Sequence, residues 1–159
     1  MKKVLNKDLT LFFEKFYPCK RIKLGKRHKV LVSIGGNVGD VKFRFKKLFN
    51  KMQKDKRVNI VKTSPILKNP PFGFKEQNYF YNAVILLETD MYIKEFFKYI
   101  MYLENFFKRE RLFKNAPRTL DIDIIFFDKI TYNKNNLQIP HAMWQSRESV
   151  LIPLIFLKD

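Results

Sequence analysis

The chain has 159 residues and a formal net charge of +17 at pH 7, from 32 Lys and Arg against 15 Asp and Glu. This length suits one domain, and an apolar content of 46% is enough for a hydrophobic core, which excludes wholesale disorder and an array of modules. A single cysteine, Cys19, excludes an internal disulfide, and no apolar run reaches the ~18 residues of a membrane helix. The apolar run at residues 9–13 is too short for a secretory signal, so we expect a cytoplasmic protein without a membrane partner.

The positive charge has two interpretations. Lysines outnumber arginines, and Phe, Asn and Ile are abundant, a mixture typical of AT-rich coding that favours a merely solvated lysine surface. Alternatively, the charge attracts an anion such as nucleic acid or polyphosphate. Composition alone leaves both open.

Hydrophobic periodicity predicts a regular succession of elements after a basic N-terminal segment. In chain order they are a strand at residues 28–34, a helix at 38–52, a strand at 58–66, a strand at 81–88, a helix at 92–108, a strand at 120–127 and a short helix at 146–151. Prolines and a glycine at residues 68–78, and a basic stretch at 109–117, predict loops.

The main elements follow the order β-α-β-β-α-β. This order predicts an α+β protein with a ferredoxin-like βαββαβ fold, in which helices pack on one face of an antiparallel sheet. We expect residues 28–159 to form this single domain and residues 1–27 to be a basic N-terminal extension outside it. Within the extension, a short amphipathic helical turn would dock on the sheet or on a neighbouring chain, formed by Leu9, Phe12, Phe13 and Phe16.

Two carboxylates, Asp121 and Asp123, lie on the last long strand that the pattern predicts. Residues i and i+2 of a strand point to the same face, about 6.6 Å apart along the chain, while Ile122 and Ile124 would point into the core. Adjacent carboxylates repel each other unless a cation lies between them, and Mg2+ takes one or two carboxylates together with substrate phosphates. The alternative is that both side chains lie on the solvent side of an edge strand.

The loop before this strand is basic and contains Arg109, Arg111, Lys114 and Arg118. Guanidinium groups bind phosphates in bidentate geometry, so a cationic loop beside a metal site is suited to a triphosphate. An ordinary solvated basic loop is the alternative.

A proline-rich loop and the strand after it carry residues suited to a flat heterocycle. Pro70 and Pro71 would hold the loop rigid, the rings of Phe72 and Phe80 would stack, and the Asn82 amide would form hydrogen bonds. A simple turn followed by a core aromatic is the alternative.

The glycine-rich turn at residues 33–40 lacks the Gly-Lys-Ser/Thr ending of a P-loop. We therefore expect Asn37 to cap the following helix and the glycines to permit tight packing. His141 follows Pro140 and is either structural or within reach of a phosphate. Two histidines and one cysteine, all far apart, exclude a metal site made of His and Cys ligands.

These segments occur in a specific order along the chain, at residues 33–40, 64–89, 117–127 and 140–154. Together they resemble the 6-hydroxymethyl-7,8-dihydropterin pyrophosphokinase family of folate biosynthesis, over roughly residues 29–157. The run from Pro117 to Asp123 is the most specific part of the resemblance.

The resemblance implies transfer of the β,γ-diphosphate of ATP to the 6-hydroxymethyl oxygen of the pterin, with release of AMP. ATP and the pterin are then the expected small-molecule substrates, and two Mg2+ ions the expected cofactor, held by Asp121 and Asp123. Besides the two aspartates, the implied catalytic positions are Arg109 and Arg111 in a mobile loop and Arg118 near the reacting groups. The implied ATP-binding positions are Glu104, Ile124, His141 and Arg147. The implied pterin-binding positions are Pro70, Pro71, Phe72, Phe80 and Asn82.

The chain departs from the family pattern at a few positions. Ser149 stands where the family often has an aromatic, and Asn69 replaces a frequent threonine. Because no metal ligand or phosphate-binding arginine is lost, we expect an active enzyme. We also expect a monomer with no nucleic-acid partner. Two alternatives stay open, a ferredoxin-like RNA-binding module and a catalytically inactive relative.

Overall fold

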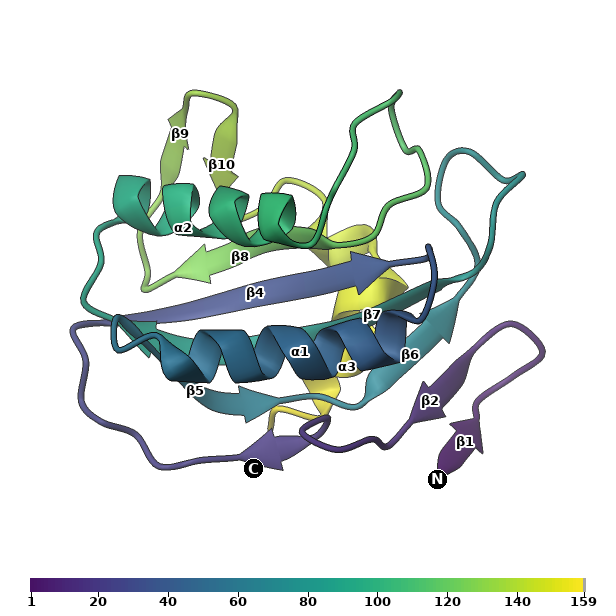
Figure 1. The fold of residues 1–159 in the computed structure, drawn as a ribbon, viewed down its shortest axis with the longest axis horizontal. Coiled ribbons are helices and arrows are strands. Elements are labelled where there is room, and N and C mark those ends of the chain that lie inside the picture. Colours follow the sequence, from purple (N-terminus) through teal and green to yellow (C-terminus); the bar gives the residue numbers. More distant parts are fainter. Residues whose placement is uncertain (159) are drawn as a thin grey trace.

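The fold is built on an antiparallel sheet whose central strands are β4 and β7, seen in Figure 1 of the computed structural model, which describes residues 1–158. β4 (His28–Gly36) pairs with β7 (Phe80–Thr89) along its whole length and with β8 (Asp121–Phe127) on its other side. β7 also pairs with β5 (Val58–Thr63) and β6 (Ile66–Asn69). The prediction of a mixed helix and strand protein with an antiparallel sheet is therefore confirmed.

Helices cover both faces of the sheet. α1 (Val41–Lys54) and α2 (Ile93–Phe106) lie on one face, and α3 (Glu148–Ile155) lies on the other, after the short 3-10 helix η1 (Trp144–Ser146) (Figure 1). The expectation that the helices share one face is wrong for α3. Alternate residues of β4 are buried on both sides, so that Val32 packs with α1 and α2 while Leu31 packs with Val150 of α3. A strand that is apolar on both faces needs a cover on each.

The N-terminal segment forms strands that join the same sheet. β1 (Lys2–Val4) pairs with β2 (Thr10–Phe12), β2 pairs with β6, and β3 (Cys19–Lys20) pairs with β5. The predicted helical turn within residues 9–16 is wrong. Leu11 is fully buried between two partly exposed neighbours, and this alternation is that of a strand.

Several boundaries also differ from the prediction. The strand predicted at residues 58–66 is two strands, β5 and β6, which pair with successive parts of β7 and are separated by Ser64 and Pro65. A hairpin of β9 (Tyr132–Lys134) and β10 (Leu137–Ile139) was not predicted, although its two-residue turn, Asn135–Asn136, carries the positive φ angles that Asn tolerates.

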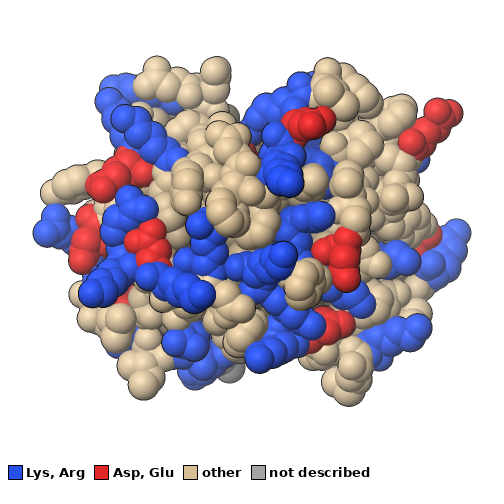
Figure 2. Space-filling view, in the orientation of Figure 1, with Lys and Arg blue, Asp and Glu red and all other residues tan. Residues whose placement is uncertain are grey.

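The positive charge covers much of the helical face of the molecule. Figure 2 shows Lys and Arg side chains spread over the face that carries α1 and α2, with few acidic groups among them. Among residues 1–158, each helix is too short or too polar to span a membrane.

Candidate active site

Asp121 and Asp123 lie at the start of β8, where it pairs with the end of β4. Asp121 is opposite Gly35 and Asp123 is opposite Ser33. Both side chains are partly exposed, and Ile122 between them is buried in the core. Although β8 is the edge strand of this side of the sheet, the two carboxylates line a hollow beside α3 and do not face open solvent.

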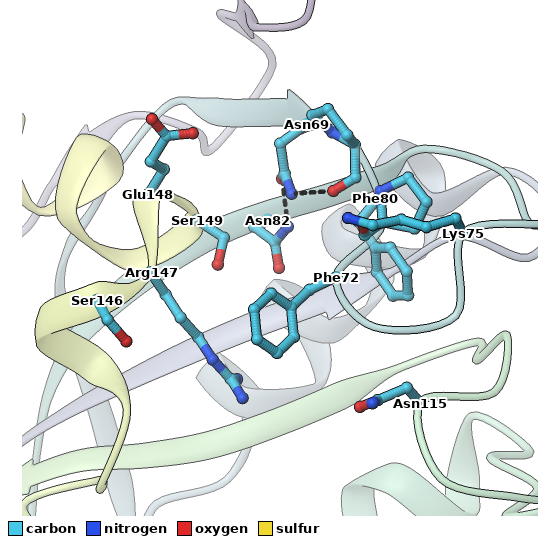
Figure 3. A pocket seen from close by; sticks show the side chains of 12 residues that line it. Asn69, Phe72, Lys75, Phe80, Asn82, Asn115, Ser146, Arg147, Glu148 and Ser149 are labelled. Atoms are coloured by element: carbon cyan, nitrogen blue, oxygen red, sulfur yellow. Dashed lines mark hydrogen bonds between the residues drawn. The ribbon is translucent and has the colours of Figure 1, made fainter.

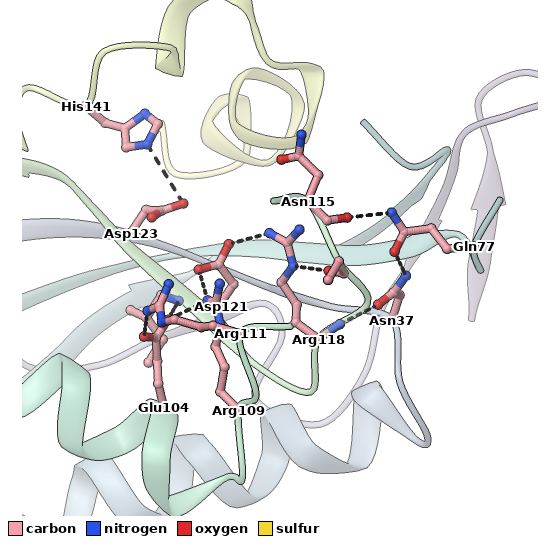
Figure 4. Close-up of polar contacts among 12 residues, drawn as sticks. Asn37, Gln77, Glu104, Arg109, Arg111, Asn115, Arg118, Asp121, Asp123 and His141 are labelled. Atoms are coloured by element: carbon pink, nitrogen blue, oxygen red, sulfur yellow. Dashed lines mark hydrogen bonds and ion pairs between the residues drawn. The ribbon is translucent and has the colours of Figure 1, made fainter. Parts of the chain in front are cut away.

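Asp121 is held by two arginines from the preceding loop (Figure 4). Arg109 Nη1 donates to Asp121 Oδ1, and Arg118 Nη1 donates to Asp121 Oδ2 at 3.0 Å. Arg109 Nη1 also donates to Glu104 Oε2 at 2.9 Å, and Arg111 Nη2 donates to Glu104 Oε1 at 2.9 Å. Charge-assisted bonds of this length fix the loop against α2 and β8.

Glu104 is the buried anchor of this network. Its side chain is 3% exposed and also accepts a hydrogen bond from the backbone N–H of Ile122 at 2.9 Å. Burial raises the pKa of Glu104, while that N–H and the arginines favour its charged form. A charged group so placed requires cationic partners, which explains why two arginines converge on it.

The two aspartates have opposite electrostatic surroundings. Burial alone would raise the pKa of Asp121, but Arg109 and Arg118 hold it below its usual value. Burial, together with the charge of Asp121, raises the pKa of Asp123 to about 7. The nearest ion-pair partner of Asp123 is His141, with Nε2 4.0 Å from Oδ2, and burial followed by the charge of Arg147 lowers the pKa of His141. The charges of Arg147 and Arg109 oppose the rise in the pKa of Asp123 but do not cancel it, so Asp123 has weaker cationic compensation than Asp121.

Two cavities meet at this carboxylate pair. One, of about 640 Å³, extends from Asp121 and Asp123 along α2 to the β9–β10 hairpin. The other, of about 430 Å³, lies between the proline-rich loop and the start of α3. A narrow hollow of about 40 Å³ is lined by residues of both cavities and by the two aspartates. The acidic pair therefore lies between two cavities, with the narrow hollow joining them.

The smaller of these two cavities brings together all five residues predicted to bind a flat heterocycle: Pro70, Pro71, Phe72, Phe80 and Asn82. Asn82 Nδ2 donates to Asn69 Oδ1 at 2.6 Å, which fixes the orientation of the Asn82 amide (Figure 3). The guanidinium of Arg147 lies 5.3 Å from the centre of the Phe72 ring. Gly35 lacks a side chain where a Cβ would lie 2.4 Å from Asn82 Oδ1, so the predicted tight packing is confirmed there.

The larger cavity contains most of the residues predicted to bind the nucleotide. Glu104, Ile124 and His141 line it, together with Arg111. Arg147 was also predicted to bind the nucleotide, but it lines the smaller cavity and the hollow between the two cavities instead.

Sequence reasoning missed a chain of amides that ties the loops together. Asn37 does not cap α1, whose N-cap is Asp40. Asn37 Oδ1 instead accepts from the Arg118 N–H at 3.0 Å, and its Nδ2 donates to Gln77 Oε1 at 2.9 Å. Gln77 in turn donates to the Asn115 carbonyl at 2.9 Å (Figure 4). Gln77 and Asn115 lie in irregular loops, where no periodicity identifies a residue.

Unpaired donors remain at the site. Among the described residues, the Nε atoms of Arg109 and Arg147 are buried without a hydrogen-bond partner. Buried donors normally find an acceptor, and Arg147 lines the smaller cavity and the hollow, so its orphaned N–H is suited to an acceptor on a ligand there. Acidic and cationic groups between two cavities are typical of enzymes that transfer phosphoryl groups.

Comparison with known proteins gives the family. A sequence model of the 7,8-dihydro-6-hydroxymethylpterin-pyrophosphokinase (HPPK) family matches residues 31–159. The chain therefore belongs to this family, and the resemblance predicted from its motifs is confirmed.

Individual relatives agree with this assignment. The 2-amino-4-hydroxy-6-hydroxymethyldihydropteridine pyrophosphokinase of Campylobacter jejuni is 43% identical over 128 residues, which cover 80% of this chain and 82% of that protein. The protein of the same name from Helicobacter pylori is 39% identical over 145 residues, or 88% of each chain. The folic acid synthesis protein FOL1 of Dictyostelium discoideum is 33% identical over 79% of this chain, but only 19% of that longer protein. These matches favour the enzyme over an RNA-binding module or an inactive relative.

Proposed function

We propose that the protein transfers the diphosphate of ATP to 6-hydroxymethyl-7,8-dihydropterin and releases AMP, a step of folate biosynthesis. Membership of the family supports this reaction. The structural observation that carries it is the meeting of two cavities at Asp121 and Asp123, one sized for a flat heterocycle and one for a nucleotide.

The smaller cavity would bind the pterin. Its ring would stack on the aromatic wall formed by Phe72 and Phe80, while the fixed amide of Asn82 would form hydrogen bonds with the polar edge of the ring. Pro70 and Pro71 would keep the loop in one conformation and so reduce the entropy cost of binding.

The donor set at the carboxylate pair fits Mg2+. Among the described residues, no group of three or more His, Cys, Asp or Glu side chains is placed to hold a metal ion, so the protein alone would not complete a coordination shell. Two carboxylates on one face of β8 suit an ion that keeps water and substrate phosphates as its other ligands. Asp121 and Asp123 would hold two such ions, which when bound neutralise charge on the transferred diphosphate.

The arginines would bind and orient the phosphates. Arg109 and Arg118 are preordered by Asp121, and the free Nε of Arg109 would donate to a phosphate oxygen. Arg111 is more exposed and, within residues 1–158, is tied only to Glu104, so it would close over the nucleotide and exclude water from the reacting groups. Ile124 and His141 would contribute contacts to the nucleotide from the larger cavity, and Arg147 would donate from its other wall.

The strand order supports a ferredoxin-like βαββαβ core, in which β4 and β7 lie between β8 and β5. Residues 28–159 would be the pyrophosphokinase domain and residues 1–27 an extension to it. A cytoplasmic monomer that binds no nucleic acid completes the proposal.

The reaction is tested by measuring AMP and pterin diphosphate formed from ATP and 6-hydroxymethyl-7,8-dihydropterin, with and without Mg2+. We expect both products in equal amounts, and only when Mg2+ is present. Formation of ADP in place of AMP, or full activity in EDTA, would contradict the proposal. A reaction without the pterin is the control for simple ATP hydrolysis.

A further inference from the structure

The N-terminal hairpin pairs with the strand that leads into the proposed pterin pocket. β7 covers one edge of β6, and β2 covers the other, with Leu11 opposite Leu67 and Phe12 opposite Ile66. β1 in turn pairs with β2 and forms the outer edge of this end of the sheet. Without the hairpin, β6 would be an edge strand of four residues with one row of unpaired backbone groups.

The hairpin also joins β6 to α3 through a separate apolar cluster. Leu11 and Leu67 are both completely buried, Leu9 is 6% exposed, and Ile152 of α3 packs against them. This cluster lies on the face of the sheet that α3 covers, apart from the main core under α1 and α2. This cluster therefore connects the N-terminal hairpin and β6 to α3, near the other end of the sequence.

Polar contacts tie the hairpin to the far end of the pocket loop. Tyr79, the residue before β7, donates its hydroxyl to Asp8 Oδ1 at 3.0 Å. The turn that presents Asp8 is closed by Asn6, whose Oδ1 accepts from the Asp8 N–H at 2.8 Å and the Leu9 N–H at 2.9 Å. The hairpin thus contacts the chain on both sides of the loop at residues 70–78.

The elements held in this way form two walls of the smaller cavity. β6 ends at Asn69, which orients the Asn82 amide, and α3 begins with Glu148 and Ser149, which line the opposite side. No residue of the described hairpin lines this cavity itself. The charged groups of the site lie on other elements. Asp121 and Asp123 are on β8, which pairs with β4, and Glu104 is on α2, which packs on the opposite face of the sheet from α3.

We propose that the hairpin at residues 2–12 is a positioning element for the acceptor pocket, which holds β6 and α3 at the separation that the flat ring requires. The identity of the ligand rests on the proposed function. The segment lies before residue 31, where the family match begins. The chain would thus fix its acceptor site with residues that touch neither substrate.

The test compares two leucine truncations of equal burial. Leu11→Ala removes the centre of the hairpin cluster, and the matched control, Leu48→Ala, removes a completely buried leucine of α1 from the main core. We expect Leu11→Ala to raise the KM for the pterin roughly tenfold, with kcat and the KM for ATP nearly unchanged, because misplacement of a binding wall weakens one substrate. The control should lose comparable thermal stability without a change in either KM.

An equal change in pterin KM for both variants, or no change for Leu11→Ala, would overturn the proposal. If Leu11→Ala does not fold, Asn6→Ala opens the hairpin turn at the surface and should raise the KM for the pterin by a smaller factor, with kcat unchanged.

Hydrogen exchange separates this proposal from the proposed function. Faster exchange of the backbone amides at residues 66–69 and 148–152 in Leu11→Ala, but not in Leu48→Ala, would support the positioning role even if the wild-type protein did not use the pterin. Unchanged exchange there would overturn it.

Discussion

The two cavities that meet at β8 are built in different ways. The larger one is lined by the charged groups Glu104, Arg111, Asp121 and Asp123. Arg109 and Arg118 hold these groups in place from behind the wall, through bonds to Glu104 and Asp121. The smaller one combines apolar and amide groups from segments far apart in the chain, with Asn69 beside Asn82 and Ser149 across from them. The charged side chains of Lys75, Arg147 and Glu148 also line it.

This difference implies different responses to ligand. On the charged side, the arginines already have carboxylate partners, so the nucleotide must compete with or add to existing ion pairs. On the other side, strand pairing and packing set the shape before any ligand binds. The first cavity would control the rate through electrostatics, whereas the second would control affinity through shape.

Removal of one carboxylate tests the charged side most severely. Asp123→Asn keeps the size of the side chain but removes its charge, and we expect kcat to fall by about a thousandfold or more, because bound ions would no longer be held against the phosphates. The KM for the pterin should change little. AMP release measured at saturating Mg2+ gives the result.

The matched control for this loss of charge is Glu95→Gln, on the exposed face of α2. Circular dichroism of both variants should match the wild type, since within residues 1–158 the Asp123 side chain forms no hydrogen bond and only approaches His141, at 4.0 Å. Normal AMP production by Asp123→Asn would refute the metal assignment and remove the contrast between the two cavities.

Arg109→Ala should have the next largest effect. Its guanidinium bonds to both Glu104 and Asp121, and its loss should lower kcat by about a hundredfold while the affinity for ATP changes less, because it acts on charge that develops in the transition state. Arg111→Ala is the comparison, since that side chain is 58% exposed and, in the described part of the chain, bonds only to Glu104. Single-turnover kinetics and equilibrium nucleotide binding separate the two effects, and a loss of ATP affinity alone would contradict this role.

Much of the fold was predictable because its signals are local. The strand at His28–Gly36 and the helices at Val41–Lys54 and Ile93–Phe106 follow from hydrophobic periodicity within a single window. The strands at Thr10–Phe12 and Ile66–Asn69 were not predicted, because each is short and gains its stability from pairing with the other across more than fifty residues of chain.

The candidate site shows the same limit. Asp121 and Asp123 were identifiable from their spacing, which places both on one face of a strand. The amide chain through Gln77 and Asn115 was not, because it depends on how two loops meet. The raised pKa of Asp123 was not predictable either, because it results first from burial and then from the charge of Asp121. The sequence specifies neither the degree of burial nor the distance between the two carboxylates.

Adjacent glycines at the end of β4 allow each cavity to be disturbed by one methyl group. In Gly36→Ala the new Cβ would lie 2.5 Å from the Thr119 carbonyl oxygen, so the backbone beside Arg118 must move and kcat should fall roughly tenfold. In Gly35→Ala the Cβ would lie 2.4 Å from Asn82 Oδ1, so the pterin KM should rise by a similar factor. Steady-state kinetics with each substrate varied would show the two patterns. Identical patterns in the two variants would mean that the cavities do not respond independently.

Ionic strength should produce the smallest and most general difference between the two sides. Salt screens the attraction between the phosphates and the exposed Arg111 over a Debye length of about 8 Å at physiological ionic strength, so the KM for ATP should rise severalfold when salt is increased to about 0.5 M. The uncharged pterin ring binds by stacking and hydrogen bonds, and its KM should change by less than about twofold under the same conditions. Potassium chloride titrations at fixed free Mg2+ provide the measurement, with sucrose of equal osmolality as the control. Parallel increases in both KM values would show that charge also shapes the pterin pocket, where Lys75, Arg147 and Glu148 would then be the groups responsible.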